Sequence, residues 1–291
     1  MVRQIQVKTL LNRHRKRDEW FLDDYSINPY SSCYYNCLYC YIRGSKYGYN
    51  LTEHLSVKVN APEVLERELA KRAGRGEYGV ILLSSATEAY PPIEEELKLT
   101  QRLLKTILKH RFPIHIVTKS PLVLRDLDLL RELDGAAKLP PDLSSLKHGV
   151  IISFSLSTLD DELAKLFEPG APKPWERLEA ANRCVEEGFL TGIAYIPVLP
   201  FLSDSHSDLD SMVSAARDCG VKFVFIGALT LFGEAKQLYY RALEKRYPEL
   251  IPKYEALFRG SFTPDRSYRM RLEQKAIQLC RKYGVSYQIP H

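Results

Sequence analysis

The sequence contains no long apolar run. No stretch reaches the roughly 18 uncharged apolar residues that indicate a membrane-spanning helix. The first twenty residues, MVRQIQVKTLLNRHRKRDEW, also lack the apolar segment of a signal peptide. We therefore expect a cytoplasmic protein with no membrane partner.

Cysteines are few. Six in 291 residues, unevenly spread, are too few for a disulfide framework in a chain of this size. Three of them stand close together, at Cys33, Cys37 and Cys40, which in a cytosolic protein indicates metal or redox chemistry. We expect the other three to be small buried side chains on apolar helix faces: Cys184, Cys219 and Cys280.

The excess of positive charge is small. The chain has 41 Lys and Arg against 36 Asp and Glu, a net charge of +5. This balance permits an anionic partner without requiring one. Basic residues concentrate at positions 13–17 and again near the C-terminus, at Arg266, Arg269, Arg271, Arg281 and Lys282. Two interpretations stay open: solvated surfaces, or phosphate contacts with nucleic acid.

Six short apolar segments predict β-strands. Each is rich in Val, Ile, Phe or Tyr and is bounded by Gly, Pro or Ser. They are almost continuously apolar, as expected for parallel strands covered on both faces. The predicted strands are Asp24–Asn28, Tyr78–Ser84, Pro113–Thr118, Gly149–Ser155, Leu190–Val198 and Lys222–Ala228.

Helical periodicity separates these strands. It predicts helices at Ile93–His110, at Pro174–Glu187 with Gly188 as the C-cap, and at Ser207–Cys219. Strands that alternate with helices indicate a parallel β/α fold, either an open sheet or an incomplete barrel. No low-complexity linker divides the chain. We predict a basic N-terminal extension at 1–23, a core at 24–235 and a mostly helical C-terminal extension at 236–291 that packs on the core.

The clustered cysteines have the spacing C-x3-C-x2-C and follow the first predicted strand. Three thiolates so close together wrap a loop around one metal centre. No fourth cysteine follows, and the nearest downstream histidine is His54. Three thiolates on a four-iron cluster leave one iron open to an external ligand. The alternative is a non-catalytic protein whose cysteines hold an electron-transfer cluster, or zinc in a site closed by His54 or His14.

This motif and the sequence after it resemble the radical S-adenosylmethionine (SAM) superfamily. Within it, the chain is most similar to the group of spore photoproduct lyase, also called DNA repair photolyase-like. The similar blocks occur in order between about residues 24 and 204. They are NPY at 28–30, YCY at 39–41, SSATEAYP at 84–91, TKS at 118–120, RD at 125–126, SFSLS at 153–157, EPG at 168–170 and RLEA at 177–180.

The resemblance implies a (β/α)6 partial TIM barrel with a [4Fe–4S] cluster on Cys33, Cys37 and Cys40. It also implies that SAM binds the open iron and that a one-electron reductant, flavodoxin- or ferredoxin-like, supplies the electron. Cleavage of SAM would then give a 5′-deoxyadenosyl radical that abstracts hydrogen from a substrate. Nucleic acid is one option for that substrate, and a protein or small molecule is the other.

The resemblance also implies contacts with the cofactors. Tyr39 and Tyr41 flank the last cysteine and are expected to lie against the adenine or the cluster. Ser85 and Lys119, which follow the second and third strands, match positions that contact SAM. An ammonium group such as that of Lys119 suits the methionyl carboxylate as a point charge. A serine at a strand end can equally be a turn or capping residue.

Further positions follow from the same comparison. Ser155 on the fourth strand suits a ribose hydroxyl, and the backbone near Ile196 suits adenine. Glu88 either positions substrate or is a carboxylate at a helix entry. Glu168 and Arg177 are expected to form an internal salt bridge.

One departure from the group bears on the reaction. Spore photoproduct lyase has a hydrogen-donating cysteine at the end of the second strand, where this chain has Ser84 and Ser85. A serine hydroxyl is a poor hydrogen-atom donor because its O–H bond is much stronger than the S–H bond of a thiol. The resemblance therefore does not extend to repair of the spore thymine photodimer.

Overall fold

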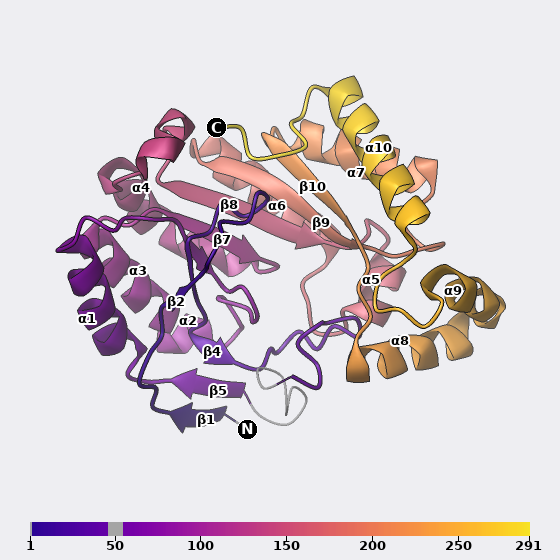
Figure 1. Ribbon diagram of the computed structural model, residues 1–291, viewed down its shortest axis with the longest axis horizontal. Coiled ribbons are helices and arrows are strands. Elements are labelled where there is room, and N and C mark those ends of the chain that lie inside the picture. Colours follow the sequence, from indigo (N-terminus) through magenta and orange to yellow (C-terminus); the bar gives the residue numbers. More distant parts are fainter. Residues whose placement is uncertain (1, 46–54) are drawn as a thin grey trace.

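A curved sheet dominates the computed structural model, which describes residues 2–45 and 55–291 (Figure 1). Six of its strands are parallel, and each one neighbours the next along the chain. They are β3 (Tyr25–Ile27), β6 (Ile81–Leu83), β7 (Ile114–Thr118), β8 (Val150–Leu156), β9 (Leu190–Val198) and β10 (Phe223–Ala228). All six predicted strands are confirmed, and the first two are shorter than predicted.

The parallel strands are buried on both faces, as their continuous apolar sequences predict. In β7, Ile114 and Ile116 belong to the main core between the sheet and the helices. The alternate residue Val117 faces the inside of the curved sheet and lines a cavity there. The sheet therefore separates a packed outer core from an inner cavity.

Helices cover the outer side of the sheet (Figure 1). Beside β3 to β8 lie helices from the first half of the chain, and beside β8 to β10 lie helices from the second half. They are α1 (Ala61–Ala73), α3 (Leu99–His110), α4 (Leu127–Ala136), α6 (Pro174–Glu186), α7 (His206–Asp218) and α10 (Arg266–Tyr283). Gly188 has a positive φ of 88° just after α6, in agreement with its predicted capping role.

The prediction of one helix over Ile93–His110 is wrong. The chain forms a short α2 (Glu94–Leu97), then turns at Lys98, whose φ is 49°, and begins α3. The buried Glu94 carboxylate accepts a hydrogen bond from the Thr100 amide (3.0 Å), which satisfies a donor at the start of α3. A bent pair of helices therefore replaces one straight helix.

The C-terminal stretch is mostly helical, as expected. Helices α8 (Gly233–Arg246) and α9 (Ile251–Phe258) lie together beside α5 (Asp161–Phe167), and α10 returns to pack on β10 and α7 (Figure 1). Stacking of Phe167 on Tyr239, with ring centroids 4.6 Å apart, joins α5 to α8. In the described part of the chain, no helix is long and apolar enough to cross a membrane.

The N-terminal segment has structure that the sequence analysis did not predict. Strand β2 (Asn12–Arg13) extends the main sheet antiparallel to β3. Strands β1 (Val2–Ile5), β5 (Leu55–Lys58) and β4 (Tyr30–Ser31) form a separate small sheet. Trp20 then lies inside the barrel, where its ring stacks on Phe225 at 5.9 Å. The domain boundaries at 23 and 235 stay predictions.

Candidate active site

A cavity of about 580 Å³ opens at the carboxyl ends of the parallel strands. Residues from the ends of β6 to β10 and from the cysteine loop line it. Every site residue predicted from the sequence lies in its wall: Cys33, Cys37, Tyr39, Cys40, Tyr41, Ser85, Lys119, Ser155 and Ile196. The carboxyl ends of parallel strands are where β/α barrels place their active sites. The roles of these residues as ligands stay predictions.

The cysteine loop is held from outside by the turn between α5 and α6. The amide of Leu38 donates to the carbonyl of Phe167 (2.8 Å), and the amide of Gly170 donates to the carbonyl of Tyr35 (3.1 Å). A Cβ atom on Gly170 would stand 2.8 Å from the carbonyl oxygen of Tyr34. A glycine at position 170 therefore lets the two segments approach this closely.

The three thiols share the cavity but are not arranged around one ion. Burial raises the pKa of all three, that of Cys33 to about 12. Across residues 2–45 and 55–291, no three His, Cys, Asp or Glu side chains are placed to hold a single metal ion. In an iron–sulfur cluster each thiolate binds a different iron, so three thiols that line one cavity still fit that group.

His14 does not provide the fourth ligand that the zinc alternative requires. Its ring nitrogens contact Asp23 (2.8 Å) and the Ser26 hydroxyl (3.0 Å), and it does not line the cavity. His54 lies outside the described residues.

Lys119 is part of a polar network in the cavity wall. Its ammonium donates to the Ser155 hydroxyl (2.6 Å) and lies 3.6 Å from Glu168. Arg177 forms an ion pair with Glu168 at 2.5 Å, with both side chains 1% exposed. The predicted Glu168–Arg177 salt bridge is thus confirmed. Tyr39 donates its hydroxyl to the same carboxylate, so its ring is fixed next to the cysteines.

The charges in this network favour an anionic ligand. Burial acts to raise the pKa of Glu168, but Lys119, Arg177 and the hydrogen bonds outweigh it and lower the pKa to about 2. Glu168 is therefore an anion, and it faces two cations. The remaining positive charge suits a carboxylate such as that of an amino acid.

Asn28 organises the loop after β6, a role that the sequence analysis missed. Its side-chain oxygen accepts from the amides of Ala86 (2.9 Å) and Thr87 (3.2 Å). Its side-chain nitrogen donates to the Ser85 hydroxyl (3.1 Å). These bonds fix the orientation of Ser85 in the cavity wall. The only sequence signal was the place of Asn28 in the NPY block.

Glu88 joins the same loop to the end of β7. Its buried carboxylate accepts from the Thr118 hydroxyl (2.5 Å) and from the amides of Lys119 and Tyr90 (both 3.0 Å). Burial raises its pKa. The structure shows Glu88 as a link between strand ends and not as a residue at a helix entry.

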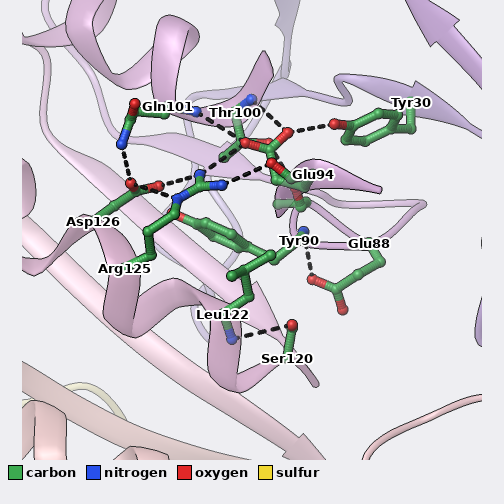
Figure 2. Close-up of polar contacts among 11 residues, drawn as sticks. Tyr30, Glu88, Tyr90, Glu94, Thr100, Gln101, Ser120, Leu122, Arg125 and Asp126 are labelled. Atoms are coloured by element: carbon green, nitrogen blue, oxygen red, sulfur yellow. Dashed lines mark hydrogen bonds and ion pairs between the residues drawn. The ribbon is translucent and has the colours of Figure 1, made fainter. Parts of the chain in front are cut away.

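A second buried network supports the strand that leads into the cysteine loop (Figure 2). Tyr30 on β4 donates to Glu94, which also pairs with Arg125 at 2.8 Å. Arg125 makes a further ion pair with Asp126, again at 2.8 Å. Tyr30 and both carboxylates are buried, so the network fixes the corner between α2 and α3 against the start of the loop.

Aromatic side chains from the N-terminal segment close the inside of the barrel. Trp20 and Phe21 line the cavity, together with Ile196. The Phe21 carbonyl contacts the buried ring of His115 (2.9 Å), and the other ring nitrogen contacts the Ser153 hydroxyl (2.7 Å). Trp20 and Phe21 were not assigned from the sequence, although the three consecutive apolar residues 20–22 in a polar segment are a usable signal.

Strand order, cavity and cysteine loop together define a partial β/α barrel with a cofactor site at the carboxyl ends of its strands. Residues 27–213 match the family model of the Radical SAM superfamily. The chain therefore belongs to the radical SAM superfamily and is an enzyme, so a non-catalytic role is set aside. The family implies an iron–sulfur cluster and SAM as cofactors, together with a need for a reductant.

Relatives cover most of the chain. It is 30% identical over 269 residues to an uncharacterized protein of Mycobacterium tuberculosis, spanning 90% of this chain and 75% of that one. It is 32% identical over 228 residues to an uncharacterized protein of Methanocaldococcus jannaschii, covering 77% of each.

Solved structures of spore photoproduct lyase have the same fold. One superposes with a TM-score of 0.68 over 97% of this chain and 79% of that chain, at 18% identity. Another, with bound AdoMet and dinucleoside spore photoproduct, has a TM-score of 0.63 over 94% of this chain and 78% of that chain, at 18% identity. The predicted partial barrel is thus confirmed.

Proposed function

We propose that Cys33, Cys37 and Cys40 hold a [4Fe–4S] cluster with which the enzyme cleaves SAM and abstracts hydrogen from a substrate. When bound and reduced, the cluster supplies the electron that breaks SAM into methionine and a 5′-deoxyadenosyl radical. The observation that carries the proposal is the convergence of the three thiols with Lys119 in one cavity. No other cysteine of the described chain lines that cavity.

We assign residues of the cavity wall to the carboxylate, the ribose and the adenine of SAM. The Lys119 ammonium binds the methionyl carboxylate, because the network around it has a spare positive charge. Ser85 and Ser155 present hydroxyls to the rest of the molecule, Ser155 toward the ribose, and the backbone at Ile196 contacts adenine. Tyr39 and Tyr41, which flank Cys40 in the sequence, lie against the adenine or the cluster.

The apolar part of the wall keeps water from the reacting groups. Trp20, Phe21 and Ile196 of β9 contribute to it, and all three pack against an apolar cluster that includes Ala194 and Phe225 of the sheet. We further propose that residues 24–235 are the catalytic core, flanked by the extensions at 1–23 and 236–291. The enzyme acts in the cytoplasm and takes its electron from a flavodoxin- or ferredoxin-like protein.

Formation of 5′-deoxyadenosine tests this function. After anaerobic reconstitution, wild-type protein with dithionite and SAM is expected to release 5′-deoxyadenosine and methionine. Cys40→Ala is expected to release neither, whereas Cys184→Ala is expected to match the wild type, because Cys184 is buried on the outer side of the sheet. Activity retained in Cys40→Ala would contradict the ligand assignment.

Nucleic acid is the substrate class that we propose. Spore photoproduct lyase, which shares the fold, has been solved with a dinucleoside spore photoproduct. Arg266, Arg269 and Arg271 are exposed near the start of α10. In the other basic segment, Arg17 is already paired with Asp24 at 2.9 Å, whereas Arg13, Arg15 and Lys16 are exposed. Phosphate contacts are therefore expected from exposed basic residues of both segments.

The salt dependence of binding tests the substrate class. Fluorescence anisotropy with single- and double-stranded DNA and RNA is expected to show affinity that falls steeply with salt. The triple change Arg266→Gln, Arg269→Gln and Arg271→Gln should reduce the slope. Absence of binding at low salt would contradict a nucleic acid substrate and leave the cleavage of SAM untouched.

A further inference from the structure

Arg43 is buried within the cysteine loop. It stands three residues after Cys40, and its side chain is 1% exposed. The guanidinium Nε donates to the carbonyl of Cys37 (2.9 Å), and Nη2 donates to the carbonyl of Asn36 (2.9 Å) and to its side-chain oxygen. One side chain therefore fixes the backbone at the middle cysteine.

Among the residues that the structure describes, the positive charge of Arg43 has no close carboxylate. The nearest acidic side chain in this part of the chain is Glu234, which lies 3.9 Å from Nη1 and is 48% exposed. Nη1 itself is buried and has no hydrogen-bond partner in the described part of the chain. Burial of a charge is costly unless the charge is closely paired.

Other shielded arginines of the chain are paired. Arg177 lies 2.5 Å from Glu168, and Arg125 lies 2.8 Å from both Glu94 and Asp126. Arg43 differs because its hydrogen bonds all go to the cysteine loop. A negatively charged group bound by that loop would compensate the buried positive charge of Arg43.

We propose that Arg43 is a positioning residue that shapes the cysteine loop and places a fixed positive charge beside the cluster, making the cluster easier to reduce. The proposal rests on the proposed function, because it requires that the loop holds a cluster. Reduction adds one negative charge to the cluster, and a nearby cation stabilises the charge that is added. Hydrogen bonding, net charge and burial are the features through which proteins set cluster potentials.

Redox titration of the reconstituted holoenzyme tests the proposal through two changes with opposite expected effects. Arg43→Gln removes the charge and is expected to lower the equilibrium constant for one-electron reduction about tenfold, a shift of about 59 mV to lower potential. Glu234→Gln removes the carboxylate that partly offsets the charge of Arg43, so it is expected to shift the potential of the cluster upward. Arg43→Lys keeps the charge, so its potential is expected to lie nearer to the wild type.

Stability and iron content separate this role from a purely structural one. Urea unfolding of the metal-free variants reports the loss of the loop's hydrogen bonds separately from the change in potential. A retained cluster with unchanged potential in Arg43→Gln would overturn the proposal. If Arg43→Gln does not fold, Glu234→Gln provides the test. Glu234 lies partly exposed in the first turn of α8, so this variant is expected to fold. A cluster potential unchanged in Glu234→Gln would then overturn the proposal. Wild-type protein that assembles no cluster would instead refute the proposed function.

Discussion

Removing one partner of the buried ion pair between Arg177 and Glu168 should strongly destabilise the metal-free protein. We consider Arg177→Met, which keeps much of the side-chain volume and removes the charge. The change leaves Glu168 buried and also removes donors to the carbonyls of Ser155 (3.0 Å) and Pro172 (2.9 Å). Breaking a buried pair by removing one partner costs about 3–5 kcal/mol.

The pKa of Glu168 gives a magnitude for its whole network, in which Lys119 acts together with Arg177 and the hydrogen bonds. Its fall from 4.5 to about 2 corresponds to roughly 3 kcal/mol of stabilisation of the charged form. Because the pKa in the folded protein lies below the value in the unfolded chain, this stabilisation is fully present above about pH 4.5. It is lost as the pH falls toward 2.

Urea unfolding of the metal-free protein at pH 7, followed by circular dichroism, measures the effect. The matched control is Arg183→Met, which breaks exposed pairs with Glu186 (3.1 Å) and Glu187 (2.7 Å) and should cost about 0–1 kcal/mol. Arg177→Met should cost at least 3 kcal/mol. If both variants lose less than 1 kcal/mol, the pair does not stabilise the cavity wall and the reasoning is refuted.

Three further predictions concern the loop after β6, the cysteine loop and the inside of the barrel. Asn28→Ala leaves the amides of residues 86 and 87 without their acceptor, which costs roughly 1–3 kcal/mol. The affinity for SAM, measured by calorimetry, should therefore fall about tenfold. An unchanged affinity would contradict the role of Asn28. Gly170→Ala places a Cβ atom 2.8 Å from the Tyr34 carbonyl oxygen and should lower the iron content after reconstitution. The control Gly135→Ala adds a Cβ atom that meets no atom within 4 Å, so its iron content should not fall. Equal iron content in both variants would refute the steric argument. Burial lowers the pKa of His115 to about 4, below its ordinary 6.5, because it disfavours the charged ring. The stability of the folded protein that depends on a neutral His115 is therefore complete above pH 6.5 and is lost as the pH falls through 4. The unfolding free energy of His115→Gln should therefore depend less on pH between 6.5 and 4 than that of the wild type, and equal slopes in urea titrations would count against this.

The sequence predicts the barrel well because its strands have a strong signal. Parallel strands buried on both faces are continuously apolar, and each is bounded by turn residues. The small sheet was missed because β1 and β5 are four residues long, partly exposed and far apart in the sequence. The break between α2 and α3 was missed because apolar periodicity does not report where one buried carboxylate, that of Glu94, caps the second helix.

The site was predictable where it depends on side-chain chemistry and spacing. The cysteines, Lys119 and the strand-end serines occur at the expected positions and share one cavity. Asn28 and Arg43 were not predicted to be important, because their partners are backbone groups whose positions only the folded chain reveals. The contribution of Trp20 depends on where the N-terminal segment enters the barrel, which no local pattern specifies.

In the proposed function, a cluster held by three cysteines leaves one iron open to SAM. Electron paramagnetic resonance of the dithionite-reduced protein, recorded with and without SAM, tests it most directly. We expect SAM to change the spectrum of the wild type, because in the proposed function its amino and carboxylate groups would bind the open iron. A reduced four-iron cluster whose spectrum is the same with and without saturating SAM would contradict the claim.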